Sequence, residues 1–148
     1  MIESCEITSA SIDGIGIFVV GRKSFVEVKN TTFHCCGLCG VYCGFEAECV
    51  VSLSVLCDND NCGVMVDQKN KSCRLDRCII SNNFRSGVDV RNHGKATLNG
   101  CTLLDNKLVG VLASEKSLVT LIECCGLNQP NFTKAEFSSQ FILQNCFF

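Results

Sequence analysis

The sequence has no tryptophan, one tyrosine and one proline among its 148 residues. It has no uninterrupted apolar run long enough to span a membrane, and its first residues do not join a basic segment to an apolar one as a secretory signal does. The net charge is −2 and the 13 Lys and Arg residues are scattered. Because nucleic-acid binding needs a focused basic surface, we do not expect nucleic acid as a partner. The lack of a long apolar run means that we do not expect a membrane either.

Cysteine, in contrast, is abundant, with 14 residues. In a short secreted chain this count would indicate a disulfide framework. Most of these cysteines recur at equivalent, inward-facing positions of a repeat, which is typical of small buried apolar side chains. We therefore expect free thiols, a reducing compartment and a cytoplasmic protein.

Two sequence markers recur with the same period. A glycine followed by an aliphatic residue returns at spacings of 24, 23, 24 and 23, in Gly16-Ile17, Gly40-Val41, Gly63-Val64, Gly87-Val88 and Gly110-Val111. A second frame, Leu98-x-x-Cys101-x-Leu103, returns at spacings of 22 to 26 and first occurs at Ile2-x-x-Cys5-x-Ile7. Two independent markers with one period indicate a repeat fold.

Each repeat contains two short strand-like segments, such as 63–66 and 73–75, separated by Asn-, Asp- and Gly-rich turns. A leucine-rich repeat would have a helical or leucine-bearing return segment, whereas here this segment is a second strand. The sequence therefore predicts an all-β fold, a right-handed single-stranded parallel β-helix (a pectin-lyase-like solenoid). We expect about six coils of 22–26 residues in one domain, 1–148, with an irregular coil or a loop-out at 126–140.

Most repeated residues have an architectural explanation. Asn59, Asn83 and Asn106 are expected to adopt the left-handed backbone of a sharp turn and to form an amide ladder. The repeated glycines mark corners that have no room for a Cβ atom. The second frame carries a ladder of small side chains, Cys5, Thr31, Ser54, Cys78, Cys101, Cys124 and Cys146.

The chain opens and closes inside copies of the second frame. An uncapped parallel stack exposes backbone donors and acceptors. We therefore expect a fragment or uncapped part of a longer solenoid, or a chain whose ends a partner covers. End-to-end self-association through the uncapped coils is a further expectation.

The positions that follow each inward aliphatic residue are predicted to face outward in two stripes. The outer stripe is Phe18, Tyr42, Met65, Asp89 and Leu112, and the adjoining stripe is Val20, Gly44, Asp67, Arg91 and Ser114. Asp67, Asp89 and Arg91 should lie close together. Paired carboxylates beside an arginine suit glycoside hydrolysis or cation-assisted elimination, and a solvated ion-pair patch is the simpler interpretation.

Histidine and cysteine raise a second set of alternatives. Cys36-x-x-Cys39 has the spacing of zinc ligands, and Cys57 and Cys62 follow one coil later. Zinc, a disulfide between coils and free thiols are the alternatives, of which free thiols are favoured, so we predict no metal and no cofactor. His93 lies in a turn, where a solvated side chain is the simpler interpretation.

The frame Asn106-x-x-x-Gly110-Val111, preceded by Leu98-x-x-Cys101-x-Leu103, resembles the parallel β-helix repeat of carbohydrate-binding and sugar-hydrolysing proteins. The copies at 83–90 and 106–111 are most similar to intracellular members, the β-helix of Shc SH2-domain-binding proteins and of the F-box substrate receptor of ubiquitin ligases. The resemblance implies a right-handed β-helix that serves as a protein-recognition surface.

We therefore predict a non-catalytic protein-interaction scaffold whose partners are other proteins. Its binding surface is predicted to contain Phe18, Tyr42, Met65, Asp67, Asp89, Arg91 and Leu112. The alternative is a polysaccharide lyase or glycoside hydrolase that uses Asp67 and Asp89, with Arg91 beside them, on the same face.

Overall fold

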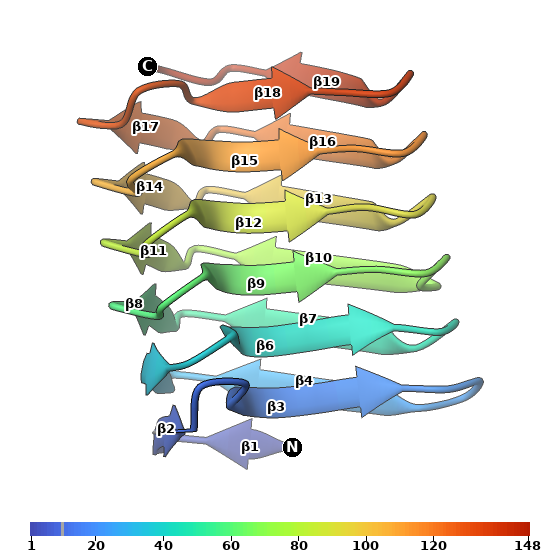
Figure 1. Cartoon of the computed structure of the whole chain (residues 1–148), viewed down its shortest axis with the longest axis vertical. Coiled ribbons are helices and arrows are strands. Elements are labelled where there is room, and N and C mark those ends of the chain that lie inside the picture. Colours follow the sequence, from blue (N-terminus) through green and yellow to red (C-terminus); the bar gives the residue numbers. More distant parts are fainter. Residues whose placement is uncertain (10) are drawn as a thin grey trace.

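The computed structural model describes residues 1–9 and 11–148. In these residues nineteen strands form a solenoid of three parallel sheets, stacked coil upon coil (Figure 1). Neighbouring strands of a sheet come from successive coils, which confirms the predicted all-β parallel β-helix of about six coils. The same residues contain no helix that is long and apolar enough to cross a membrane.

The three sheets are named here by the order of their first strands in the chain. Sheet A contains β1 (Ile2–Glu3), β4 (Phe25–Lys29), β7 (Glu48–Ser52), β10 (Ser72–Asp76), β13 (Lys95–Asn99), β16 (Leu118–Ile122) and β19 (Gln140–Gln144). Sheet B contains β2 (Glu6–Ser9), β5 (Thr32–Cys36), β8 (Val55–Cys57), β11 (Ile79–Ser81), β14 (Thr102–Leu104) and β17 (Cys125–Leu127). Sheet C contains β3 (Ile15–Val20), β6 (Cys39–Gly44), β9 (Cys62–Val66), β12 (Ser86–Val90), β15 (Val109–Ala113) and β18 (Thr133–Ala135).

A coil thus has three strands where the sequence predicted two, because the second frame divides into a strand of sheet A and one of sheet B. Between β13 and β14 the chain bends at Gly100, which has a φ of 60°. The equivalent residues of two other coils, Leu53 and Arg77, have φ values of 49° and 51°. This left-handed residue and the small residue after it separate the two strands, and side chains other than glycine adopt the left-handed conformation here despite its cost.

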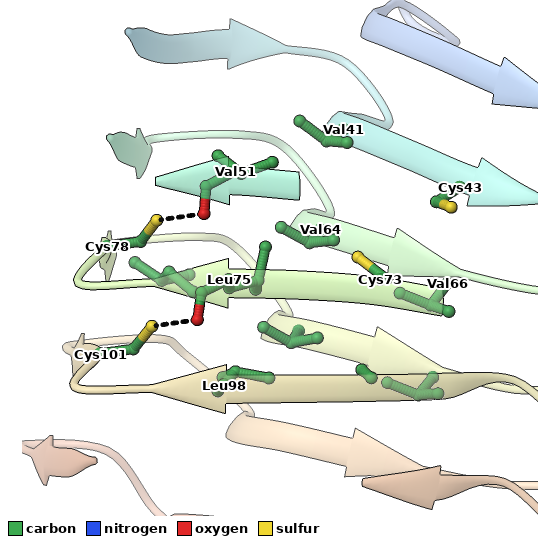
Figure 2. Packing of buried hydrophobic residues seen from close by; sticks show 14 of the residues in the cluster. Val41, Cys43, Val51, Val64, Val66, Cys73, Leu75, Cys78, Leu98 and Cys101 are labelled. Atoms are coloured by element: carbon green, nitrogen blue, oxygen red, sulfur yellow. Dashed lines mark hydrogen bonds between the residues drawn. The ribbon is translucent and has the colours of Figure 1, made fainter. Parts of the chain in front are cut away.

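The core fills the space between the sheets with columns of identical or similar side chains. Val64, Val88 and Val111 are fully buried and pair in register along sheet C. Leu75 and Leu98 face them from sheet A (Figure 2). Each such aliphatic side chain contributes about 1.5–3 kcal/mol on burial, so the repeated apolar positions account for the stability of the stack.

The amide ladder lies at the corner between sheets B and C and is confirmed. Asn59 Nδ2 donates to Asn83 Oδ1 at 2.9 Å, and Asn83 Nδ2 donates to Asn106 Oδ1 at 3.0 Å. Asn106 continues the ladder to Gln129, which the sequence did not predict. The prediction that the ladder asparagines themselves are left-handed is wrong. The left-handed residue is the one before each of them, for example Asn82 with a φ of 54°. An inward-pointing amide requires ordinary strand backbone, so the sharp turn moves back by one residue.

The glycines of the first marker lie inside the strands of sheet C, and their steric role is confirmed. A Cβ atom on Gly87 would lie 2.7 Å from the carbonyl oxygen of Gly110 and 3.0 Å from Asn106 Nδ2. A Cβ on Gly63 would lie 2.9 Å from the carbonyl oxygen of Gly87. The two distances to carbonyl oxygens are shorter than real Cβ contacts, so the backbone of the next coil leaves room only for glycine, and the ladder amide lies close by.

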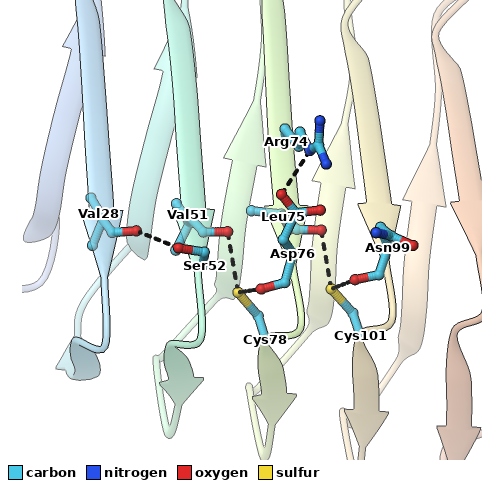
Figure 3. A network of polar contacts seen from close by, with 9 residues as sticks. All are labelled: Val28, Val51, Ser52, Arg74, Leu75, Asp76, Cys78, Asn99 and Cys101. Atoms are coloured by element: carbon cyan, nitrogen blue, oxygen red, sulfur yellow. Dashed lines mark hydrogen bonds and ion pairs between the residues drawn. The ribbon is translucent and has the colours of Figure 1, made fainter.

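The small-residue ladder has a hydrogen-bonding role as well as a steric one (Figure 3). The Cys78 thiol donates to the carbonyl oxygen of Val51 at 3.4 Å, and that of Cys101 donates to Leu75 at 3.3 Å. Each acceptor belongs to the preceding coil. The position therefore requires a side chain that is small and can donate a hydrogen bond.

The segment 126–140, which the sequence predicted as an irregular coil or a loop-out, contributes β18 to sheet C. There Thr133 pairs with Val111 and Ala135 with Ala113. Gly126 has the Phe132 ring against it, since a Cβ there would meet the ring at 2.0 Å. Phe132 packs against the main core and fills the space left by Gly126, which pairs with the buried Leu103 of the preceding coil.

Candidate functional site

The outer stripe exists as a continuous column on sheet C. Its members pair in register from one coil to the next, in the order Phe18, Tyr42, Met65, Asp89 and Leu112. Asp67 and Arg91 follow β9 and β12 directly, and the backbone hydrogen bond from Arg91 to Val66 aligns the second residue with the first. The periodicity of the sequence therefore predicted correctly that these residues share one face of the sheet.

The expected exposure of this column was wrong for most of its members. Phe18 is 57% exposed, but Tyr42, Met65, Asp89 and Leu112 are 8%, 4%, 4% and 9% exposed. Asp67 is 8% exposed. Coils about 4.8 Å apart bring outward side chains into contact along the column, so that they cover one another.

The Tyr42 side chain lies along its own strand and covers part of the face. Its ring is 4.8 Å, centroid to centroid, from that of Phe18. A Cβ on Gly44 would lie 2.9 Å from the Tyr42 ring, so glycine at this position makes room for the tyrosine. The Tyr42 hydroxyl donates to Asp67 Oδ2 at 3.3 Å.

Asp67 is held by three donors. Besides the tyrosine hydroxyl, its Oδ1 accepts hydrogen bonds from the Gln68 backbone N–H and from Asn92 Nδ2, both at 2.7 Å. Burial and the charge of Asp67 raise the pKa of Tyr42 to about 12, so the hydroxyl remains protonated and donates near neutral pH. Asp67 therefore acts as a structural acceptor that ties three coils together.

Asp89 and Arg91 form a partly buried ion pair one coil later. The Arg91 guanidinium donates to Asp89 Oδ2 at 2.9 Å and contacts the Met65 sulfur at 3.4 Å. Burial raises the pKa of the Asp89 carboxyl, and the positive charges of Arg91 and Arg85 oppose that effect. Arg91 lies back over the column, which is a further reason that Met65 and Asp89 are covered.

Two polar atoms of this ion pair have no hydrogen-bond partner among the described residues. These atoms are Asp89 Oδ1 and Arg91 Nε, and both are buried. Their two residues line a depression of about 190 Å³, together with Leu112 and Phe137. Phe137 is 74% exposed. The depression thus brings an ion pair and an exposed aromatic ring together.

A separate hollow of about 610 Å³ lies along the turns that join sheet C to sheet A. Its lining includes Phe45, Lys69, Asn92 and His93, with Arg22 and Glu46 paired beside them. His93 lies in a turn and is exposed, as the sequence predicted, and it also lines this hollow. The sequence did not indicate this hollow, because its residues belong to turns of different coils.

Of the four cysteines considered as zinc ligands, two lie side by side. Cys39 and Cys62 pair in register and pack with Tyr42 and Met65 on the outer face of sheet C. The thiol contact with Cys39, together with burial, raises the pKa of Cys62 well above its usual value. All fourteen cysteines are free thiols. No group of three or more His, Cys, Asp or Glu side chains in residues 1–9 and 11–148 could hold a metal ion.

Asn92 and Arg85 contribute to the site but were not predicted, and Gly44 was placed in the adjoining stripe without a role. Asn92 follows Arg91 and reaches Asp67 across one coil, a contact that the register could have indicated. Gly44 has no side chain to draw attention to it, and its role depends on how the tyrosine ring turns. Sequence periodicity identifies a column but not the direction in which long side chains fold back over it.

Comparison with known proteins bears on the architecture. A family model described as the right handed beta helix region matches residues 1–125. Neither the curated proteins nor the solved structures provide a match.

Proposed function

We propose, since the chain belongs to the right-handed β-helix family, that it is a non-catalytic protein-interaction scaffold that binds other proteins through the outer face of sheet C. The binding face consists of Phe18 and Phe137 as exposed aromatic residues, with the Asp89–Arg91 ion pair between them. Tyr42, Met65, Asp67 and Leu112 form the packed floor on which these groups are held.

The unpartnered atoms of the ion pair carry this proposal. Buried polar atoms in proteins are nearly always hydrogen-bonded, and leaving one unpaired costs about 1–3 kcal/mol. Asp89 Oδ1 and Arg91 Nε are buried and unpaired beside a depression. A partner that inserts a donor and an acceptor there would satisfy both atoms.

The composition of the face fits the same proposal. Aromatic residues and arginine contribute most of the binding energy in typical protein interfaces, and the most important contacts lie in desolvated pockets. Phe18 and Phe137 are 57% and 74% exposed. Phe137 lines the depression, and Phe18 lies three coils before Asp89 in the same column, so the apolar surface of both rings is available to a partner.

The closer resemblance to Shc SH2-domain-binding and F-box β-helices is part of the proposal. It favours a cytoplasmic protein that recognises other proteins, and the fourteen free thiols suit a reducing compartment. End-to-end self-association is proposed as a second mode of contact, because β1 and β19 each lie at an edge of sheet A.

A polysaccharide lyase or glycoside hydrolase that uses Asp67 and Asp89 is the alternative. Burial raises the pKa of Asp89, which is the direction that a general acid needs. Asp67 suits it less, since both of its oxygens already accept hydrogen bonds. A catalytic base or cation ligand needs free lone pairs, so the face suits binding better than catalysis.

The proposal is tested by changing the exposed residues, because substitution of Asp67 or Asp89 would disturb a buried network. Phe18→Ser with Phe137→Ser removes the two aromatic residues of the face. Phe25→Ser with Phe84→Ser is the matched control, since these residues are 59% and 71% exposed and lie outside the face. The first pair should abolish capture of partners that the wild type and the control retain. Equal capture by all three proteins would exclude this face.

A further inference from the structure

An exposed cysteine on sheet B lies beside a histidine and a glutamate. His34 Nδ1 is 3.3 Å from Cys35 Sγ, and His34 Nε2 is 2.6 Å from Glu6 Oε1. Glu6 comes from β2 and His34 from β5, the next strand of the sheet. The three side chains form a chain of contacts from carboxylate to imidazole to thiol.

The contacts define which nitrogen of His34 carries the proton. An ionised carboxylate can only accept hydrogen bonds, so Nε2 must donate to Glu6. In the neutral ring Nδ1 is then left as the acceptor, and its lone pair faces the Cys35 thiol. This is the tautomer that a base needs to take a proton from sulfur, and the carboxylate orients the ring for that role.

Cys35 occupies a position at which the four following coils have Asp or Asn. Its backbone N–H donates to the carbonyl oxygen of Asp58, which aligns the two residues. The equivalent residues Asp58, Asn82, Asp105 and Asn128 all have φ near +50°, as Cys35 does with 54°. Asp and Asn accept this conformation readily, whereas cysteine does so at a cost. The backbone alone therefore does not explain the choice of cysteine.

The coil before Cys35 leaves it uncovered. β2 pairs with β5 through Thr8 and His34, and then through Ser9 and Cys36, so Cys35 is an extra residue with no partner in β2. Bulges of this kind redirect a side chain and are common beside functional sites. Cys35 is exposed, as are the equivalent residues Asp58 and Asn82.

We propose that Cys35 is a nucleophilic thiol, deprotonated by His34 and oriented through Glu6, and that it is a site of oxidation by hydroperoxides. The thiol passes its proton to His34, and the thiolate is the nucleophilic form. Sγ attacks one oxygen of hydrogen peroxide, the S–O bond forms and the O–O bond breaks. The leaving hydroxide takes the proton from His34 as water, sulfur loses two electrons, and Cys35 becomes a sulfenic acid.

The neighbouring thiol does not compete for this reaction. Cys57 pairs with His34 in the next coil and is only partly exposed. Burial and the contact with Asp58 raise the pKa of Cys57 to about 12, so it stays protonated near neutral pH. Reactivity is therefore expected to concentrate on one of the two thiols beside the imidazole.

Cys5 provides an internal control. It is exposed, and its nearest polar contact is the carbonyl oxygen of Glu3 at 3.2 Å, with no histidine beside it. The folded protein is treated with limiting iodoacetamide at pH 7, and the alkylation of each cysteine is followed by peptide mass spectrometry. We expect Cys35 to react at least about tenfold faster than Cys5. In urea the two rates should become similar.

Two variants test whether the reactivity of Cys35 comes from the His34 imidazole or only from exposure of the thiol. His34→Asn should bring the Cys35 rate to within about twofold of the Cys5 rate, while Glu6→Gln should lower it by a smaller factor. After hydrogen peroxide, dimedone should label Cys35 in the wild type and not in His34→Asn. Equal alkylation of Cys35 and Cys5, an unchanged rate in His34→Asn, or dimedone labelling that does not favour Cys35 would overturn the proposal.

Discussion

Tyr42 and Asp67 are joined across one coil of the solenoid, with the tyrosine hydroxyl 3.3 Å from Asp67 Oδ2. Tyr42 is the single tyrosine of the sequence, and there is no tryptophan. Its ionisation can therefore be followed directly by absorbance near 295 nm. This contact supports the floor of the binding face, so titration of the Tyr42 hydroxyl measures how well that floor is packed.

The first prediction concerns the pKa of Tyr42. Burial, followed by the charge and hydrogen bond of Asp67, raises it to about 12. Absorbance titration of the folded protein should give a midpoint well above the ordinary value of about 10. Asp67→Asn should lower the midpoint only in part, because burial is the larger cause. A midpoint near 10 in the wild type would contradict the packed floor.

The same shift predicts a dependence of stability on pH. The folded state holds the Tyr42 proton more tightly than the unfolded state, so this contribution is complete below pH 10 and is lost as pH rises from 10 to about 12. Urea unfolding at several alkaline pH values measures the loss. Tyr42→Phe should be less sensitive over this window, and equal slopes for the two proteins would count against the assignment.

A second prediction tests the amide ladder. Asn83 donates to Asn106 Oδ1 and to the carbonyl oxygen of Leu56, and accepts from Asn59. Asn83→Ala leaves these buried groups unpaired and should lower the free energy of unfolding by about 2–4 kcal/mol. Urea denaturation measures this change. Asn82→Gly, a substitution that suits its left-handed backbone, is the control and should change stability little.

The thiol ladder gives a third prediction. Cys101→Ser keeps a small donor, as Ser54 already does in the same column, and should cost about 1 kcal/mol. Cys101→Leu overfills a fully buried position and should cost about 1–3 kcal/mol or more. Thermal unfolding compares the two variants. If leucine were tolerated as well as serine, neither size nor hydrogen bonding would explain the ladder.

The sequence predicted the columns of this fold well, because a constant period determines which residues stack. It placed Tyr42, Met65, Asp89 and Leu112 on one face, and it placed Asn59, Asn83 and Asn106 at one corner. It did not predict that most of that face is covered. Exposure depends on where long side chains turn, and Arg91 folds back over Met65 and Asp89.

The contact of Glu6 with His34 was also outside the reach of the sequence. The two residues are 28 positions apart, which does not match the period of the coils. Glu6 pairs with Thr32, so its contact with His34 is diagonal, two residues further along β5, and the repeat predicts paired positions rather than diagonal contacts. Left-handed positions such as Leu53 were equally unexpected, because propensity favours Asn or Gly there.

A fourth prediction separates binding from catalysis. Purified protein is incubated with acidic and neutral polysaccharides, and new reducing ends and unsaturated products are measured. We expect no turnover above buffer, because the oxygens of Asp67 are occupied by three hydrogen bonds. Products that form with the wild type and disappear in Asp89→Asn would instead support the polysaccharide-active alternative.

The binding face is tested most directly by photo-crosslinking from its own residues. A photoreactive phenylalanine analogue is placed at Phe18 or, as a control with 59% exposure on sheet A, at Phe25. We predict that a discrete protein partner crosslinks at Phe18 but not at Phe25, and that Phe137→Ser, which changes an exposed side chain of the face, abolishes this crosslink. Identical crosslinking at both positions, or a Phe18 crosslink that survives Phe137→Ser, would contradict the outer face of sheet C as the binding surface.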